Sequence, residues 1–323
     1  MPSPIQTRVV SLETLPELLP TFLQNLSIAR GQIIVDQLHN MVDSGKADGI
    51  DLVVAYEERD GIEVDIAAAI AISFQGSDSA TLLHATQFQS ESPNANLIEA
   101  VRFHLDKLLT LRGMRFVQWA SDVDDFSEAA ELWREAMGFE WAADLDYLSV
   151  SIDPKSKRDS PQRIRLEPTR WLMGSMINED DFARIVDQTY IDTLDCPALL
   201  NFRTAEQTIA SYQQSGAFAP HLWFTLHRAE APTDSADTPP IGVLVLAMHG
   251  TKVAELVYMG VVPAARGMSL GKEVIQSVIE TVQTAGASRL ILAVDQQNVY
   301  ARRLYDAFGL KCMLRESVAV KNL

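Results

Sequence analysis

Residues 258–273 have the sequence YMGVVPAARGMSLGKE, and this stretch decides how the rest of the chain is interpreted. An apolar strand pattern runs into a proline, a short loop with arginine and glycine follows, and a helical pattern begins near Leu270. The free N–H groups and positive dipole end of a helix N-terminus favour an anion, above all a pyrophosphate. Gly267 and Gly271 would let the backbone approach such a ligand closely, and Arg266 would add charge.

The spacing of this loop excludes two familiar phosphate-binding loops. A Walker loop needs four residues between its glycines and a metal-binding hydroxyl after its lysine, whereas only three residues lie between Gly267 and Gly271, and Lys272 precedes Glu273. The GxGxxG pattern of dinucleotide-binding loops is not present either. Taken alone, the loop fits an ordinary strand-to-helix turn as well as it fits an anion site.

The order strand, loop, amphipathic helix and glycine occurs twice along the chain. A strand-like segment at 80–88 precedes a helix that ends near Gly113, and a strand-like segment at 253–262 precedes a helix that ends near Gly286. The apolar positions of both helices follow the 3.6-residue period: Leu97, Val101, Leu105 and Leu108 in the first, and Val274, Ile275, Val278, Ile279 and Val282 in the second. The sequence therefore predicts a tandem duplication of one α/β unit.

Other segments support the same organisation. Residues 51–75 predict two strands around an Arg-Asp-Gly turn, and residues 139–150 and 310–320, which end the two halves, alternate as in a closing hairpin. Residues 154–161 are polar with proline at both ends, which is typical of a linker. We expect domains at 1–153 and 162–323.

In the second half, the loop is followed by an ordered set of further motif residues. A strand leads to Asn298, and a helix then carries Ala301, Leu304, Tyr305 and Gly309 at the spacing A-x-x-L-Y-x-x-x-G. This set resembles the GCN5-related N-acetyltransferase (GNAT) superfamily, whose pattern is a [QR]-x-x-G-x-[GA] loop, an Asn and an A-x-x-L-Y-x-x-x-G-F helix. The resemblance implies the acyl-CoA N-acyltransferase fold, in which helices flank a central mixed β-sheet, here in tandem as in mycothiol-synthase-like members.

The resemblance implies acetyl-CoA or another short acyl-CoA as cosubstrate, and no metal. In the family, the loop amides hold the CoA pyrophosphate and the splayed end of the preceding strand lies along the pantetheine. Ser269 stands where the family usually has glycine, which predicts weaker rather than absent binding. The cofactor-binding residues implied in this sequence are Met259, Val261, Arg266, Gly267, Met268, Ser269, Leu270, Gly271, Lys272 and Asn298.

The resemblance also implies two catalytic side chains. Glu255 matches the offset of the general-base Glu in histone-type members, and desolvation would raise its pKa toward the range useful for deprotonating an ammonium. Tyr305 matches the Tyr that donates a proton to the departing CoA thiolate. The residues alone leave other interpretations open, because Glu255 fits an outward strand position, Tyr305 fits a core position and Asn298 fits a helix N-cap.

The first half keeps the pattern of elements but not the motif residues. Aligning Gly113 with Gly286 places Pro93, Asn94 and Ile98 opposite Arg266, Gly267 and Gly271, and places Leu82 opposite Glu255. Aligning Gly138 with Gly309 places Arg134 opposite Tyr305. We therefore expect a degenerate GNAT-like domain at 1–153, a linker at 154–161 and the catalytic domain at 162–323, with a second pocket of changed specificity as the alternative for the first domain.

The acceptor is constrained only weakly by the sequence. Asp192 and Asp195 lie where the superfamily covers its acceptor site, and their charge could steer a cationic amine. A solvated acidic face is the simpler interpretation of the same residues. Cys196 is a poor candidate for a nucleophile, because the neighbouring carboxylates would raise its pKa.

Composition excludes several classes of protein. The 43 acidic residues outnumber the 27 Lys and Arg, and a net charge of −16 disfavours nucleic-acid binding. No apolar run reaches the ~20 residues of a membrane span, and the N-terminus lacks a signal-peptide pattern. Two cysteines and six histidines in no ligand spacing suggest neither a disulfide framework nor a metal site, and favour the cytoplasm.

Together these features predict an N-acetyltransferase with its active site in the second domain. A small-molecule or peptide amine would attack acetyl-CoA directly, in a ternary complex, without nucleic-acid or membrane partners. Two other functions remain open: a non-catalytic acyl-CoA-binding or sensing protein, and a scaffold with both sites inactive. The acceptor, the acyl chain and the oligomeric state, a homodimer included, are left open.

Overall fold

The computed structural model describes residues 5–73, 77–88, 94–122, 128–153, 163–172, 175–230 and 239–323. Contacts divide the chain into two compact units: unit 1 holds Met1–Ala143 and Glu316–Leu323, and unit 2 holds Asp144–Arg315. The linker predicted at 154–161 and the Pro93 position in the first loop lie outside the described residues.

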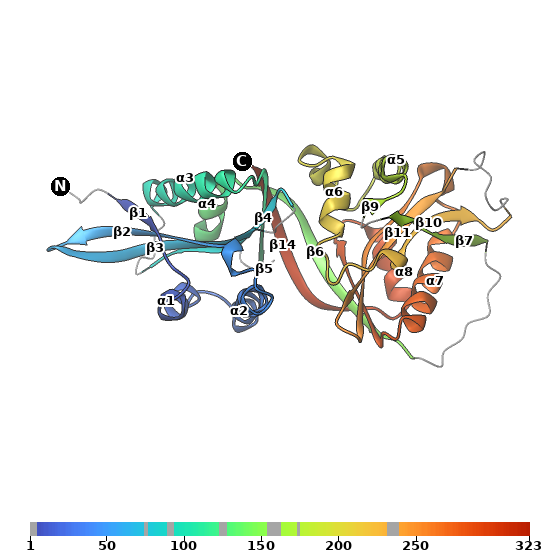
Figure 1. Ribbon diagram of the computed structural model, residues 1–323, viewed down its shortest axis with the longest axis horizontal. Helices are drawn as coiled ribbons and strands as arrows, with labels where there is room; N and C mark the ends of the chain where they lie inside the picture. Colours follow the sequence, from blue (N-terminus) through green and yellow to red (C-terminus); the bar gives the residue numbers. More distant parts are fainter. Residues whose placement is uncertain are drawn as a thin grey trace. The chain divides into compact units, whose positions relative to one another are not determined.

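Unit 1 is a mixed sheet with helices on both faces (Figure 1). Its strands hydrogen bond in the order β1-β2-β3-β4-β5-β14, with β4 and β5 parallel and the other neighbouring pairs antiparallel. The strands are β1 (Gln6–Val9), β2 (Ile50–Arg59), β3 (Ile62–Ser73), β4 (Ser79–Gln87), β5 (Phe116–Asp122) and β14 (Lys311–Asn322). The helices are α1 (Leu15–Phe22), α2 (Ile28–Asp43), α3 (Ala95–Leu111) and α4 (Glu128–Ala136).

Alternation along the strands of unit 1 produces two cores. Val53 and Ala55 on β2 pack with α3, while Leu52 and Val54 face α1 and α2, because successive side chains point to opposite faces. The predicted Arg-Asp-Gly turn joins β2 to β3 at two residues with positive φ. This is the backbone that a tight two-residue hairpin requires.

Unit 2 has the same arrangement as unit 1, a mixed sheet with helices on both faces. Its strands hydrogen bond in the order β6-β13-β12-β11-β10-β7, with β12 and β13 parallel. The strands are β6 (Glu140–Ser151), β7 (Ile164–Pro168), β10 (Trp223–Arg228), β11 (Gly242–His249), β12 (Val253–Val261) and β13 (Arg289–Asp295), with a separate small pair, β8 (Trp171–Leu172) and β9 (Ser175–Met176). The α-helices are α5 (Glu179–Tyr190), α6 (Ala205–Tyr212), α7 (Leu270–Thr284) and α8 (Val299–Ala307).

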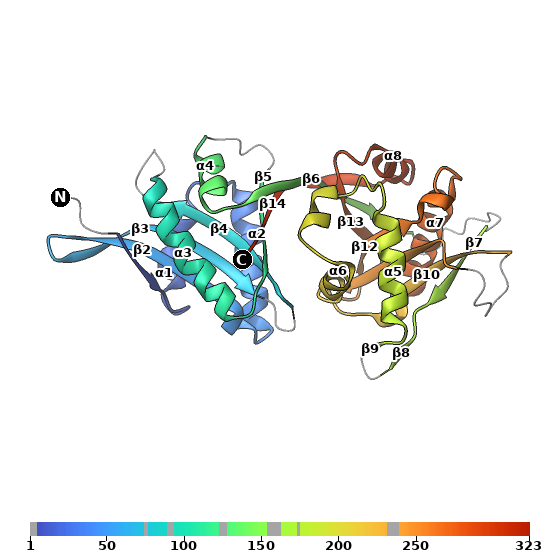
Figure 2. The same cartoon turned by 90° about the horizontal axis from the view of Figure 1, so that it is seen from above.

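The helices of unit 2 also cover both faces of its sheet. The core cluster that contains the buried side chains of α7 and α8 is separate from the cluster that contains those of α5 and α6. In the view from above, α5 crosses the strands of this sheet (Figure 2). The expected fold class, a tandem α/β arrangement with mixed sheets flanked by helices, is confirmed.

The two units match position by position along their central helices. Leu97, Val101, Leu105 and Leu109 are buried on α3, and Leu270, Val274, Val278 and Val282 are buried at the same places on α7. The glycines that follow α3, α4, α7 and α8 all have φ between 80° and 83°. Helices commonly end at a glycine in the left-handed backbone conformation, so the helices of both halves end in the same way.

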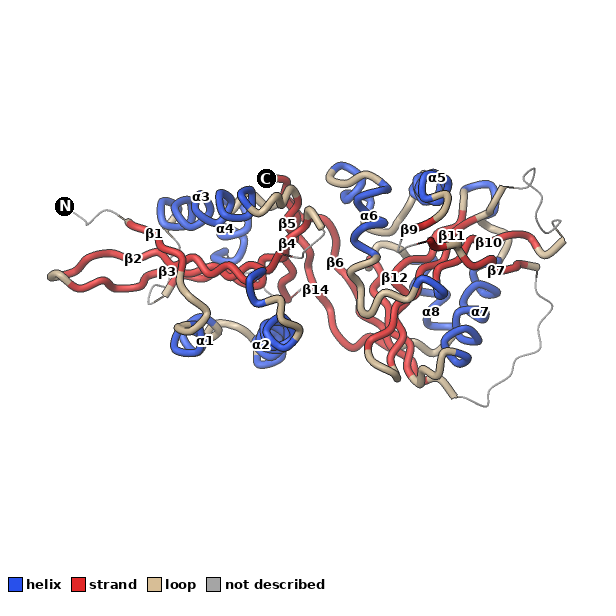
Figure 3. The backbone as a smooth tube through the Cα atoms, in the orientation of Figure 1, coloured by secondary structure: helices blue, strands red, loops and turns tan. Residues whose placement is uncertain are grey.

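The ends of the two halves differ from the prediction. Residues 140–151 and 311–322 each form one unbroken strand rather than a hairpin (Figure 3). Leu145–Ser151 of β6 pairs with β13, and Glu316–Asn322 of β14 pairs with β5. Each unit therefore takes a strand from the other half of the chain, which explains why its boundaries differ from 1–153 and 162–323.

Candidate active site

The site in unit 2 begins where two parallel strands separate. β12 and β13 pair from Val253 with Arg289 to Leu256 with Leu292, although the strands continue to Val261 and Asp295. Against β11, the register of β12 shifts so that one extra residue, Val257, is inserted. The bulge and the end of pairing leave the backbone of 257–261 facing a gap between the strands.

The loop after β12 presents an open helix terminus to this gap. Gly267 and Ser269 have φ of +73° and +59°, and Ser269 precedes α7 without capping it through its side chain. The first N–H groups of a helix have no acceptor within it, so those at the start of α7 are available to an anion. Glu273 in this first turn would oppose an anion, but its carboxylate accepts hydrogen bonds from Arg163 N–H and Nε at 2.6 and 2.5 Å.

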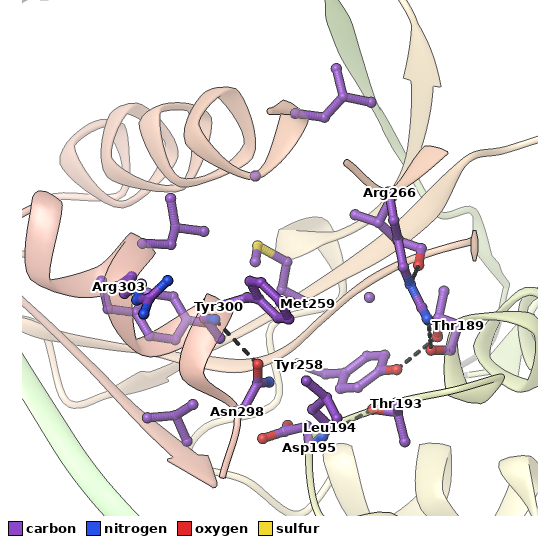
Figure 4. Close-up of a pocket in the computed structure, with 18 of the residues that line it drawn as sticks. Thr189, Thr193, Leu194, Asp195, Tyr258, Met259, Arg266, Asn298, Tyr300 and Arg303 are labelled. Atoms are coloured by element: carbon purple, nitrogen blue, oxygen red, sulfur yellow. Dashed lines mark hydrogen bonds between the residues drawn. The ribbon is translucent and has the colours of Figure 1, made fainter. Parts of the chain in front are cut away.

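A cavity of about 910 Å³ connects these features (Figure 4). Its size is within the range of small-molecule sites. Of the residues singled out in the sequence, those that line it are Asp192, Asp195, Met259, Val261, Arg266, Gly267, Ser269, Leu270, Gly271, Lys272, Asn298 and Tyr305. Within the described residues, the structure brings these positions together from α5 and its following loop, β12, α7 and α8.

Two predicted residues lie outside the cavity walls. Glu255 is placed before the bulge, opposite Ile291 in the parallel ladder, and its Oε2 lies 2.6 Å from His249 Nε2. The Glu255 side chain therefore lies beside the paired part of the two strands and outside the cavity lining, and its role as general base stays a prediction. Met268 is 43% exposed, and its sulfur accepts a hydrogen bond from Arg228.

Arg266 lines the cavity but does not hold its guanidinium free for a phosphate. Its Nε donates to the Val261 carbonyl at 3.0 Å, and its two terminal nitrogens donate to the carbonyls of Thr189 and Ile191, each at 2.7 Å. Cationic side chains often bind the last carbonyls of a helix in this way. Arg266 thus joins the end of α5 to the loop. The groups that remain to bind an anion here are the backbone N–H groups at the start of α7 and the Lys272 side chain.

Tyr305 and Asn298 are both held by α8. Tyr305 is 6% exposed, and burial raises the pKa of its phenol, with a further contribution from the Asp195 charge. The phenol therefore stays protonated at neutral pH and can donate. Asn298 is the N-cap of α8, since its Oδ1 accepts a hydrogen bond from the Ala301 N–H at 3.2 Å. The side chain of Asn298 also hydrogen bonds to Asp195.

Asp195 lies at the same end of the cavity as Asn298 (Figure 4), and it is bonded to a second acidic residue, Asp295. Asp195 Oδ1 accepts a hydrogen bond from the Asp295 N–H at 3.1 Å, and Asp295 Oδ2 accepts one from the Cys196 N–H at 3.0 Å. Burial raises the pKa of both carboxyls, and the Asp295 charge raises that of Asp195 further. Burial and these two charges also raise the pKa of the Cys196 thiol, which makes it a poor nucleophile.

Sequence reasoning missed the importance of Asp295 and Tyr258. Asp295 stands at the end of β13, where only the fold brings it to Asp195. Tyr258 follows the bulge, lines the cavity and bonds through its hydroxyl to Thr189 at 2.7 Å. Its ring stacks on Tyr212 with centroids 5.3 Å apart. The sequence offered no signal for either role beyond their places at strand ends.

Unit 1 keeps the backbone plan without this chemistry. β4 and β5 also separate, after Leu82 pairs with Trp119, and β4 carries a matching register shift. The position equivalent to Glu255 is therefore Thr81 rather than Leu82, because the strands align on their last pairs. Asn94 caps α3, since its Oδ1 accepts hydrogen bonds from the N–H groups of Asn96 and Leu97. The amides that α7 leaves open are thus occupied in α3.

A splayed parallel pair, a glycine loop at a helix N-terminus and a second helix with a buried tyrosine form, in unit 2, the acyl-CoA N-acyltransferase fold. Unit 1 repeats the strands and helices without the loop glycines or the tyrosine. Residues 193–310, which all lie in unit 2, match the model of the acetyltransferase (GNAT) family.

A solved structure supports this fold. A GCN5-related N-acetyltransferase from Sphaerobacter thermophilus is 15% identical, with a TM-score of 0.56 over 98% of this chain and 95% of that one. A tandem GNAT protein from the clavulanic acid biosynthesis pathway is 12% identical over 99% and 98% of the two chains, with a TM-score of 0.49. The comparison with curated proteins gave no match.

Membrane-spanning helices and clusters of metal-binding side chains are both absent from the described residues. No described helix is long and apolar enough to cross a membrane. Within the same ranges, no group of three or more His, Cys, Asp and Glu side chains is arranged to hold a metal ion.

Proposed function

We propose that the protein is an N-acetyltransferase that transfers the acetyl group of acetyl-CoA to a primary amine, with its active site in unit 2. The observation that carries the proposal is the single cavity that joins the uncapped N-terminus of α7, the separated ends of β12 and β13, and the phenol of Tyr305. An anion site, an extended strand edge and a proton donor are the three parts that thioester transfer from CoA needs.

The N-terminus of α7 and the separated strand ends each suit a different portion of acetyl-CoA. The open N–H groups at the start of α7 and the Lys272 ammonium suit the pyrophosphate. The unpaired backbone after Val257, beside Met259 and Val261, suits the amide-containing pantetheine arm. Gly271 lies where an added Cβ would come 3.0 Å from a Leu304 methyl, so the helix start has little room for a larger residue.

The reaction would proceed by direct attack in a ternary complex. The neutral amine attacks the thioester carbonyl, and a strand-end N–H group stabilises the oxyanion. The C–S bond then breaks, and Tyr305 donates its phenolic proton to the sulfur. Cys196 is not needed for a covalent intermediate, because burial keeps its thiol protonated.

Binding of acyl-CoA without turnover is the second candidate. It is favoured by the position of Glu255, whose carboxylate bonds to His249 instead of facing the cavity. Binding and turnover are therefore measured separately.

Calorimetric titration of acetyl-CoA tests the proposal first. We expect one site per chain, and Lys272→Glu should weaken binding by at least about tenfold while leaving α7 folded, since acidic residues suit a helix N-terminus. Lys311→Glu, the same change at an exposed position of unit 2, is the control. Two sites would contradict a silent unit 1, and no binding at millimolar ligand would contradict the proposal.

Release of CoA in the presence of primary amines then separates enzyme from sensor. Tyr305→Phe should lower turnover by at least about tenfold with unchanged acetyl-CoA affinity. Binding by the wild-type chain without CoA release from any amine would support the sensor instead.

A further inference from the structure

The carboxylate of Asp195 is a feature of the cavity that the proposed reaction leaves unexplained. The residue lines the cavity and is partly buried. Within the described residues, neither Asp195 nor Asp295 behind it forms an ion pair. An acidic side chain withdrawn from water is costly unless a cation or hydrogen bonds compensate it. Hydrogen bonds from the Asp295 N–H and the Asn298 side chain compensate part of this cost, and a positive group from outside the chain would compensate the rest.

The position of Asp195 is fixed by reciprocal backbone contacts. Its Oδ1 accepts the N–H of Asp295, while Asp295 accepts the N–H groups of Cys196 and Gln297 at 3.0 and 2.8 Å. Asn298 donates from the start of α8. The loop after α5 is thus joined to the end of β13, and the Asp195 carboxylate is held at the wall of the cavity.

The groups facing Asp195 from the surrounding elements are neutral or acidic. Its charge raises the pKa of each of five neighbours, in every case after burial itself: Tyr190 on α5, Cys196 beside it, Tyr212 on α6, Tyr258 on β12 and Tyr305 on α8. Asp144 on β6 faces Asp295. The guanidinium of Arg266, which lines the same cavity, is engaged by backbone carbonyls.

We propose that Asp195 binds the ammonium group of a cationic acceptor and removes its first proton, with Asp295 as the positioning residue behind it. This inference rests on the proposed acetyltransferase function. The acceptor class is a primary amine that is positively charged overall, because a net anionic amine would meet both carboxylates.

The proton balance assigns one task to each side chain. The Asp195 carboxylate takes one proton from the ammonium, and the neutral nitrogen then forms the C–N bond with the acetyl carbon. The C–S electron pair leaves on sulfur, which accepts the phenolic proton of Tyr305. Tyr305 regains a proton from the acylated nitrogen, and Asp195 returns its proton to water.

The test compares Asp195→Asn and Asp295→Asn with Asp306→Asn, the same change on the exposed face of α8. The probes are acetyl-CoA with putrescine, lysine or glutamate, and release of the CoA thiol is followed from pH 5 to pH 9. Asp195→Asn should lower kcat/KM for putrescine and lysine by at least about 100-fold and remove the fall in rate at acidic pH, with acetyl-CoA affinity unchanged. Asp306→Asn should match the wild type.

Asp295→Asn separates the positioning role from a structural one. Burial and the Asp295 charge raise the pKa of Asp195, so the wild-type rate should fall at a pH above the ordinary range of aspartate. Removing the Asp295 charge should move that fall to lower pH, while the amide side chain still accepts the Cys196 N–H. A purely structural loss would lower the rate without moving the profile.

Stability gives a readout that does not depend on the acceptor. A carboxyl whose pKa is raised by folding makes the folded state less stable as pH rises from the ordinary aspartate value to the raised one. Asp195→Asn should therefore unfold at a higher temperature than the wild type at pH 7, with little difference at pH 4.

The outcomes separate the inference from the function on which it rests. An active wild-type enzyme with an unchanged Asp195→Asn profile, or one that prefers glutamate to putrescine and lysine, would overturn the inference alone. Acetyl-CoA binding without release of CoA from any of the three probes would also overturn it. Absence of acetyl-CoA binding would overturn the proposed function.

Discussion

Ser269 adopts a backbone conformation that residues with a side chain rarely adopt. It adopts a φ of +59° at the start of α7, a region where residues with a Cβ cost roughly 1–2 kcal/mol. The loop needs this conformation because the first N–H groups of the helix must turn toward the cavity. Unit 1 solves the same junction differently, since Asn94 caps α3 with its own side chain.

Ser269→Gly should therefore stabilise unit 2 by up to about 1 kcal/mol, because glycine adopts positive φ without strain but loses more entropy on folding. Acetyl-CoA affinity should stay equal or rise. Denaturant unfolding and calorimetric titration measure the two quantities. Ser269→Ala is the matched control, because it removes the hydroxyl and keeps the strain; an equal gain in Ser269→Ala would contradict the explanation.

At the scale of the element, the bulge in β12 decides which side chains reach the cavity. Ala254 and Leu256 pack in the core under α7, whereas Val257 and Tyr258 both pack in the core under α5 and α6. A regular strand would have sent them to opposite faces. Glu255, on the near side of the bulge, is left with His249 as its partner.

Glu255→Gln should leave turnover within about twofold of the wild type, in contrast to Asp195→Asn. The substitution should also change stability, because the hydrogen bond between His249 and Glu255 raises the pKa of His249. The pair therefore stabilises the fold fully at a pH below the ordinary histidine pKa, and this contribution is lost as the pH rises through the raised pKa of His249. The pair is half exposed, so the loss at pH 6 should be at most about 1 kcal/mol. Steady-state rates and urea unfolding at pH 6 and 9 measure both effects, and a tenfold loss of turnover would return the base to Glu255.

At the scale of the whole chain, the last strand completes the first unit. Glu316 on β14 is 6% exposed and forms an ion pair with Arg30 on α2, which is 5% exposed and also donates to the Ala120 carbonyl. Lys321 reaches Asp106 on α3 at 2.5 Å. The core of unit 1 therefore depends on residues of β14, which are far from the rest of the unit in sequence.

Glu316→Ala should destabilise unit 1 by about 3–5 kcal/mol, because it leaves the Arg30 guanidinium buried without its partner. Denaturant unfolding followed by amide hydrogen exchange in α2 and β5 would locate the loss. Glu135→Ala, at an exposed position of α4, should change stability by less than about 0.5 kcal/mol. An equal effect of both changes would contradict the role of the buried pair.

Local sequence patterns were sufficient to predict the duplication of one α/β unit, the helix that follows the loop and the glycines at which the helices end. These features depend on local periodicity and on backbone conformations that few residues adopt. The position of Tyr305 on a buried helix face followed from the same periodicity. Most of the predicted cofactor residues line one cavity because they are close together in the chain, around a single loop.

The exchange of β6 and β14, the placement of Glu255 outside the cavity lining and the contact between Asp195 and Asp295 could be learned only from the folded chain. All three depend on contacts between residues far apart in sequence, as the Asp295 N–H and Asp195 Oδ1 are. A strand pattern does not encode its partner, and a one-residue bulge reverses which side chains face a site. Local pattern fixed the elements of this protein, and pairing between distant segments fixed which carboxylate lies at the cavity.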